Sequence, residues 1–182
     1  RTLSPDAATR RAAEAYLERS ERAPGFVVLL LQTVAMDGVP AHVRQATAVY
    51  MKNVVKRRWE DVSAEQRGQV KEAIVGVMMA APLAVRRQLS QVLALIAQHE
   101  YPDNWPTLLP ELTQKFVTAA TPSTLNWMDA HAVLETLHAL FERYRFQYRS
   151  DKLFTEIKYS LERIHNPLLA GFRAFSEIVF SQ

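Results

Sequence analysis

The stretch YPDNWPTLLPEL, residues 101–112, places three prolines and one tryptophan within twelve residues. Apolar residues recur with helical spacing on both sides of it. Pro102 is predicted to end the preceding helix, because proline has no amide hydrogen to donate. Pro106 suits the first turn of the next helix, where that amide would have no partner in any case. Trp105 brings a large apolar side chain to the junction, so the stretch predicts a rigid corner between two packed helices and neither a catalytic loop nor a ligand clamp.

Prolines, glycines and capping residues divide the whole chain into predicted helices in the same way. Ser63, followed three residues later by Gln66, resembles a capping box, and Ser150 with Asp151 marks the start of the last helix. No segment predicts a strand, and only five glycines are present, which argues against a doubly wound sheet. The predicted helices cover approximately residues 5–22, 26–36, 40–58, 63–80, 82–99, 105–118, 122–148 and 151–180.

Alternate helices share an opening in which a proline is followed, a few residues later, by an arginine: Pro5 and Arg10, Pro40 and Arg44, Pro82 and Arg86. A helix pair that recurs at roughly 40 residues is typical of HEAT and armadillo arrays. We therefore predict an all-α fold, a right-handed HEAT-repeat α-solenoid of about four helix pairs. The predicted repeats are residues 1–38, 39–80, 81–120 and 121–182. The arginines either bond to free carbonyls of a neighbouring unit or are simply solvated.

Composition excludes several classes of function. The chain has 182 residues and no cysteine, which excludes disulfides, thiolate metal sites and thiol nucleophiles. Its formal net charge of +3 is mild, whereas nucleic-acid-binding domains concentrate basic residues in patches. The longest apolar run, FVVLLL at residues 26–31, is far shorter than the roughly 18 residues of a membrane span. No Walker-type loop, G-x-S-x-G or H-E-x-x-H motif occurs, so we predict no enzymatic activity, no cofactor and no metal.

Three stretches carry a family resemblance. RQATAVYMKNVVKRRW, residues 44–59, resembles the second-repeat signature of importin-β-type nuclear transport receptors, and residues 101–112 resemble their third-repeat signature. LFERYRFQYRSDKLFTEIKYSL, residues 140–161, is similar to the CAS-type exportins among these receptors. The signature residues present are Arg44, Lys52, Asn53, Trp59, Trp105 and Pro106.

The resemblance implies a function in nuclear export. Receptors of this kind bind the GTP-bound form of the GTPase Ran through their amino-terminal HEAT repeats, carry importin-α back to the cytoplasm and shuttle between nucleus and cytoplasm. The resemblance also allows contacts with nuclear pore proteins. It implies that this chain is the amino-terminal, Ran-binding part of a longer receptor. Two alternatives remain open: a related receptor with different cargo, or a HEAT scaffold for RNA or a large complex.

The resemblance further implies that the second helix of each repeat lines the concave side and meets Ran. On the predicted helix 63–80, we expect Glu72, Val75 and Met79 to lie opposite a core face formed by residues 70, 73, 74 and 77. The alternative for these three is packing against an adjacent repeat. The other expected contact residues, which remain after the core positions are assigned, are Gln32, Glu111, Gln114 and Lys115.

Three further clusters allow a functional and a structural interpretation. Positive charge gathers at the end of one helix, at Lys52, Lys56, Arg57 and Arg58, where it fits either the helix dipole or an acidic partner surface. One helix face carries His131, Glu135 and His138, which fit exposed or interface side chains better than metal ligands. Residues 144–149 alternate aromatic and basic side chains that could stack on RNA, although at this spacing packing between repeats is the more usual role. Asn53 is expected to bond to local backbone groups.

Overall fold

The computed structural model describes residues 5–121 and 126–180, and all regular structure within these ranges is helical. The proline, glycine and capping signals, together with the helical spacing of apolar residues, therefore predicted the secondary-structure class correctly. No helix among the described residues is long and apolar enough to cross a membrane. The elements are α1 (Ala7–Ser20), α2 (Phe26–Ala35), α3 (Ala41–Arg58), the 3-10 turn η1 (Trp59–Asp61), α4 (Ala64–Ala80), α5 (Leu83–Glu100), α6 (Leu108–Ala119), α7 (Trp127–Glu142), the 3-10 turn η2 (Arg143–Arg145) and α8 (Asp151–Phe180).

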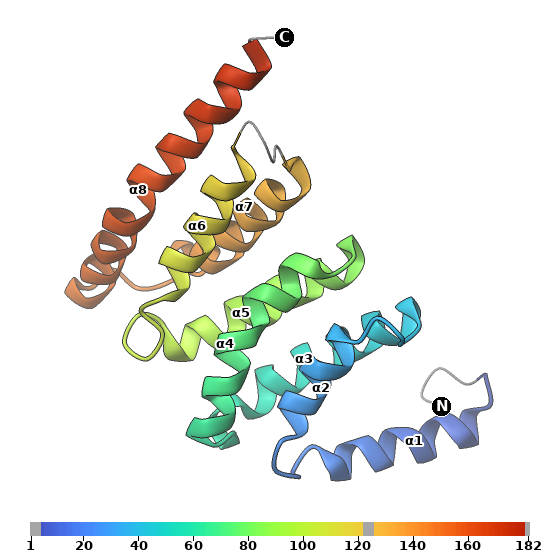
Figure 1. Ribbon diagram of the computed structural model, residues 1–182. Coiled ribbons are helices and arrows are strands. Elements are labelled where there is room, and N and C mark those ends of the chain that lie inside the picture. The colour runs from blue at the N-terminus through green and yellow to red at the C-terminus, as the bar shows by residue number, and fades with distance from the viewer. Residues whose placement is uncertain (1–4, 122–125, 181–182) are drawn as a thin grey trace.

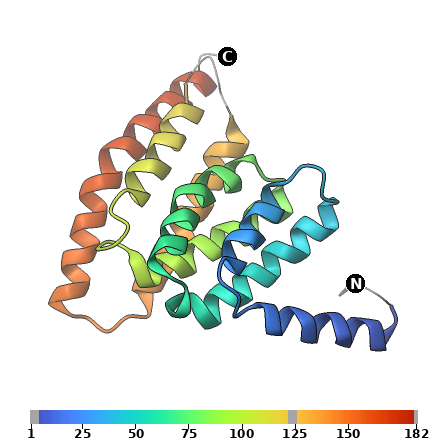
Figure 2. The same ribbon diagram turned by 60° about the horizontal axis from the view of Figure 1, so that its bottom comes forward.

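The helices form two layers that advance together along the chain. In one layer α3 packs on α5 and α5 on α7; in the other, α2 packs on α4 and α6 on α8. In Figure 1, α2, α4 and α6 lie nearer the viewer than α3, α5 and α7, while α1 and α8 occupy opposite edges in both Figure 1 and Figure 2. This arrangement of stacked helices confirms the predicted all-α solenoid. The proposed repeat boundaries fall in the connections after α2, α4 and α6, and the division into repeats itself stays a prediction.

Local signals explain where several helices begin. The Ser63 side chain accepts a hydrogen bond from the Gln66 amide at 3.4 Å, as the capping-box prediction required. Gly25 precedes α2 with a φ of 80°, a left-handed conformation that glycine adopts without steric cost. The predicted start of α7 at residues 122–123 lies outside the described residues, and within them Asn126 caps the helix by accepting from the Asp129 amide. The same helix ends at Glu142, earlier than the predicted residue 148.

The corner at residues 101–107 joins α5 to α6 as predicted. Trp105 is buried in the corner, and the Tyr101–Pro102 peptide bond is cis. One boundary was wrong, because α6 begins at Leu108 and not at Trp105. Pro110 therefore lies in the first helical turn, where its missing amide hydrogen costs no intrahelical bond. Proline at this position therefore requires no bend in α6.

Two of the three repeated arginines bind backbone carbonyls, which confirms the interpretation that they link neighbouring units. Arg44 is buried, and its Nε donates to the Val34 carbonyl at the end of α2 at 2.7 Å. Arg86 is also buried and donates to three carbonyls: Met79 at 2.7 Å, Met128 at 3.0 Å and Ala81 at 3.2 Å. Helix ends leave carbonyls without intrahelical partners. Each arginine thus satisfies such groups and ties its helix to the end of the preceding one.

Helix α1 is held far less firmly than the others. It contains no fully buried residue, and in Figure 2 it extends away from the remaining helices. Its main polar attachment is Glu21, just after its end, which accepts hydrogen bonds from Tyr50 Oη and Arg57 Nη2, both at 2.7 Å. Leu17 adds a partly buried apolar contact with the core. Burial and the hydrogen bond to Glu21 raise the pKa of Tyr50 above its ordinary range.

Candidate functional site

Most of the predicted contact residues lie on the layer formed by α2, α4 and α6 (Figure 1). Their side chains differ in accessibility. Gln32, Glu72, Gln114 and Lys115 are exposed, while Met79 and Glu111 are half-buried. The six residues come from three successive helices of one layer, which is the distribution expected of a contact surface shared along a solenoid. Their role in binding a partner stays a prediction.

Val75 does not belong to this set. Its relative exposure is 0%, and it lies in the continuous core together with Ile74 and Met78. The prediction that Val75 lies on an outer face was therefore wrong, as was the assignment of Ala73, which is exposed, to the core. The apolar residues of this segment surround much of the helix circumference. Its orientation is therefore decided by α2 and α5, which pack against it, and not by its own periodicity.

The structure brings two of the predicted residues, Glu72 of α4 and Glu111 of α6, into one shallow groove beside the corner. The groove has a volume of about 370 Å³. Its walls are formed by α4 and the segment that leads into α6, and its lining consists of Gly68, Lys71, Glu72, Asn104, Trp105, Pro106, Thr107 and Glu111. Two carboxylates and one ammonium group at the surface of a groove suit a polar, partly cationic contact from a partner protein.

The ionisation of Glu111 in this groove is affected by burial. Burial raises the pKa of Glu111, and the nearby Lys115 opposes that rise. Lys71 is already engaged, because its Nζ donates to Glu100 Oε2 at 3.0 Å and to the Asn104 carbonyl at 2.8 Å. Glu72 has no ion pair with any described residue. The carboxylates of Glu72 and Glu111 therefore remain available to an incoming donor.

A buried carboxylate that no sequence motif marked is linked to this groove through Lys71. Glu100, at the end of α5, is 3% exposed. It accepts hydrogen bonds from Trp59 Nε1 at 2.9 Å, Arg67 Nη1 at 3.0 Å and Lys71 Nζ at 3.0 Å. Burial alone would raise the pKa of Glu100, but these three donors outweigh it and hold the pKa below the ordinary value. One side chain thereby joins η1, α4 and α5.

The signature residues divide into structural and exposed groups. Trp59 and Trp105 are buried, whereas Pro106 is exposed on the corner. Lys52 crosses from α3 to α5, where its Nζ donates to Gln88 and Gln91, both at 2.9 Å. Asn53 is exposed and makes no side-chain hydrogen bond to any described residue, so the expected bond to local backbone groups was wrong.

Two of the four basic residues near the end of α3 form ion pairs within the protein. Arg57 pairs with Glu21 at 2.7 Å, and Arg58 pairs with Asp61 at 3.2 Å. Lys56 is exposed. The structure therefore gives two of these charges intramolecular partners in addition to the helix dipole.

The two other clusters have different outcomes. Glu135 lies 3.4 Å from Arg87 Nε and 3.9 Å from His131 Nδ1, while His138 is exposed. No group of three potential metal ligands occurs in the described part of the chain. Of the aromatic and basic residues in 144–149, only Tyr144 packs between elements, where its hydroxyl donates to Glu156 at 2.8 Å. Tyr148 is 92% exposed, so the expectation that it packs between repeats was wrong.

Two family models match adjoining parts of the chain. Residues 13–80 match the importin-beta N-terminal domain, and residues 82–162 match the exportin 1-like protein family. The junction between the two matches falls in the connection between α4 and α5.

Curated relatives align with nearly the whole chain. Exportin-2 of Xenopus laevis is 35% identical over 98% of this chain and 18% of the relative. The importin-alpha re-exporter of Schizosaccharomyces pombe is 37% identical over 94% of this chain and 18% of the relative. The chain thus spans less than a fifth of the length of these relatives.

A solved structure agrees with these relatives. The exportin Cse1 in its cargo-free, cytoplasmic state superimposes with a TM-score of 0.85 and 30% identity, covering 97% of this chain and 19% of that one. Sequence and fold therefore agree along the same residues, and the resemblance carried by residues 44–59, 101–112 and 140–161 is confirmed: the chain belongs to the importin-β family of nuclear transport receptors, in the branch that contains exportin-2.

Proposed function

We propose that this chain forms the arm of a nuclear export receptor that binds RanGTP and that, within the full receptor, takes part in returning importin-α to the cytoplasm. The observation that carries the proposal is the match of nearly the whole chain to proteins described as exportin-2 and as an importin-alpha re-exporter. The full receptor would shuttle between nucleus and cytoplasm. Binding would be non-covalent, without a chemical step or a cofactor.

The contact surface would be the layer of α2, α4 and α6. Glu72 and Glu111 would accept hydrogen bonds from basic groups of Ran at the groove beside the corner. Gln114 and Lys115, exposed on α6, would add polar contacts next to that groove, and Gln32 on α2 would extend the surface toward α1. Because the contact residues would lie on several helices, the buried core that holds these helices together, including the Glu100 network, would fix the distances between the contact residues.

The experiment compares two nucleotide states of Ran. The 182-residue chain is immobilised, and Ran loaded with a non-hydrolysable GTP analogue or with GDP is passed over it in a biosensor. We expect saturable binding of the GTP form and at least tenfold weaker binding of the GDP form. Equal affinity for the two forms would refute the proposal. With the full receptor, importin-α should bind more tightly when the GTP form of Ran is present.

Charge-reversal variants test the proposed surface. Glu72→Lys and Lys115→Glu should each weaken the binding of GTP-loaded Ran by about tenfold, as expected when a charged contact becomes repulsive. Lys56→Glu is the matched control, because Lys56 is exposed on α3, in the other layer. If Lys56→Glu weakens binding as much as Lys115→Glu, the contact surface has been assigned to the wrong layer.

A further inference from the structure

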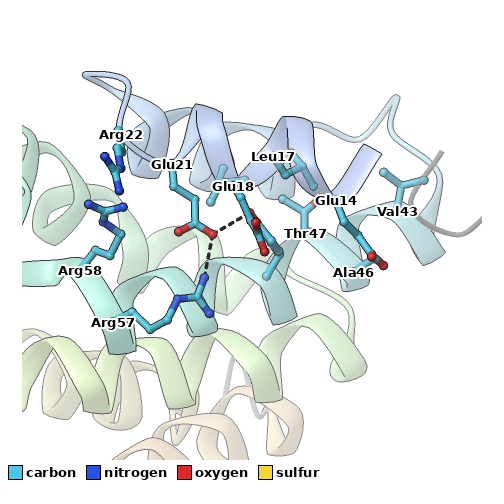
Figure 3. Close-up of a pocket in the computed structure, with 12 residues that line it drawn as sticks. Glu14, Leu17, Glu18, Glu21, Arg22, Val43, Ala46, Thr47, Arg57 and Arg58 are labelled. Atoms are coloured by element: carbon cyan, nitrogen blue, oxygen red, sulfur yellow. Dashed lines mark hydrogen bonds and ion pairs between the residues drawn. The ribbon is translucent and has the colours of Figure 1, made fainter. Parts of the chain in front are cut away.

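Two grooves meet beside the connection between α1 and α2. The first, between α1 and α3, has a volume of about 640 Å³ (Figure 3). The second, about 400 Å³, lies between the α1–α2 connection, the end of α3 and the start of α4. Glu21, Arg22 and Arg58 line both grooves. The place where the grooves join is therefore surrounded by charged side chains from the α1–α2 connection and from the end of α3.

Arg22 and Arg58 face each other at this junction. Figure 3 shows their guanidinium groups turned toward one another, one from the α1–α2 connection and the other from the end of α3. Two like charges in this arrangement repel each other. An anion placed between them would remove the repulsion and receive hydrogen bonds from both sides, and the planar guanidinium fork matches the two oxygens of a carboxylate.

The neighbouring acidic groups do not fill this position. The Glu21 side chain is 6% exposed, and Tyr50 Oη and Arg57 Nη2 both donate to its Oε1. Asp61 pairs with Arg58 Nε at 3.2 Å, yet it remains 68% exposed. Arg22 is exposed and has no hydrogen bond or ion pair with any described residue.

The balance of charge indicates the kind of anion. Arg22 and Arg58 contribute two positive charges and Asp61 one negative charge, while the negative charge of Glu21 is offset by its ion pair with Arg57. A single positive charge is therefore left at the junction. Glu14 and Glu18 extend along α1 from the junction, on the wall of the first groove (Figure 3). They would repel a dianionic phosphate more strongly than a carboxylate with one negative charge. A single carboxylate therefore fits the local charge better.

The second groove offers an apolar surface next to the two arginines. Phe26, Val27 and Val54 are buried and Val62 is half-buried, and all four line this groove. A polypeptide that places a carboxylate between the arginines could lay an adjacent aliphatic side chain against these residues. Charged anchors beside an apolar surface are a common arrangement in protein recognition.

We propose that Arg22 and Arg58 form a carboxylate-binding subsite for an aspartate or glutamate side chain of a partner protein, flanked by an aliphatic residue of the same segment. The subsite involves α1, α3 and the α1–α2 connection, away from the groove of Glu72 and Glu111. It is independent of the proposed binding of Ran, so failure of one leaves the other standing.

The test uses the 182-residue chain labelled with ¹⁵N and the peptide acetyl-Leu-Glu-Leu-amide as the probe. Addition of the peptide should shift the Nε–Hε resonances of Arg22 and Arg58 in a saturable manner, and added salt should weaken binding. The peptide acetyl-Leu-Gln-Leu-amide should bind about tenfold more weakly, because it forms no charge-assisted hydrogen bonds. Equal shifts with the two peptides, or no saturable shift with the glutamate peptide, would overturn the proposal.

Variants separate the subsite from general attraction to a basic protein. Arg22→Gln should weaken binding of the glutamate peptide by about tenfold, and it should leave folding intact because Arg22 has no partner among the described residues. Arg19→Gln is the matched control, since Arg19 is exposed on α1 and, among the residues that the structure describes, bonds only to the Ala15 carbonyl of its own helix. Equal losses in Arg22→Gln and Arg19→Gln would contradict a specific subsite. Tighter binding of a phosphoserine peptide than of the glutamate peptide would contradict the choice of a carboxylate.

Discussion

Replacement of Glu100 by glutamine tests the buried network that supports the corner. The carboxylate is 3% exposed and accepts from three donors, two of them cationic. Glutamine preserves the shape of the side chain but removes its charge. It also introduces an amide NH₂ group, which is itself a hydrogen-bond donor and would face the existing donors. Loss of one member of a fully buried ion pair costs about 3–5 kcal/mol. Because Arg67 remains 30% and Lys71 16% exposed, water compensates in part, and we expect a loss of about 2–3 kcal/mol.

The free energy of unfolding is measured by urea denaturation at pH 7, followed by tryptophan fluorescence. A loss of 2–3 kcal/mol corresponds to a fall in Tm of about 4–12 °C for a chain of this size. Glu60→Gln is the control, because Glu60 is 82% exposed and its partner His99 is also exposed. That variant should change stability by less than about 0.5 kcal/mol. A loss below about 1 kcal/mol in Glu100→Gln would refute the reasoning.

The pH dependence gives an independent check on the same residue. The pKa of Glu100 is lowered in the folded protein from the ordinary value of 4.5. Its ionised form therefore contributes stability above that value, and the contribution is lost as the pH falls below 4.5 through the lowered pKa. The stability difference between the natural protein and Glu100→Gln should accordingly shrink on acidification. A difference that stays constant from pH 7 to pH 3 would show that the charge is not the cause.

Two matched pairs test packing and the inter-helix arginines. Gly171→Ala would place a methyl group closer to the Phe116 ring than van der Waals contact allows, and it should lower the free energy of unfolding, measured by urea denaturation, by about 1–3 kcal/mol. In Gly76→Ala the added methyl group meets no neighbouring atom within 4 Å, so this variant should raise the free energy of unfolding by about 0.5–1 kcal/mol. Equal effects of the two substitutions would contradict the packing of Gly171 against Phe116. Arg86→Lys replaces the guanidinium group, which donates to three carbonyls, by a single ammonium group. We expect a loss of about 2 kcal/mol in the free energy of unfolding, which corresponds to a fall in Tm of about 4–8 °C measured by circular dichroism. Arg87→Lys, at a half-exposed ion pair, should be nearly neutral, and the absence of any difference between the two arginines would argue against the carbonyl role.

Much of the fold could be predicted from the sequence because its signals act within a single helical turn. Proline withdraws one donor, and a capping serine satisfies one amide, whatever surrounds them. The corner at residues 101–107, the start of α4 after Ser63 and the all-helical class followed from such local effects. The family could be predicted for a similar reason, since its signatures are continuous stretches such as residues 44–59.

The candidate site depended on contacts between residues that are distant in sequence. Val75 was misplaced because apolar residues surround much of α4, so the helices that pack against it decide which side is buried. Glu100 shows no local pattern, and only the fold brings Trp59, Arg67 and Lys71 to its carboxylate. The sequence by itself determined the all-helical class, several of the helix starts and the family that the chain resembles. The tertiary structure decided which faces are buried and which charges meet, because burial and ion pairing are properties of neighbouring helices and not of any one segment.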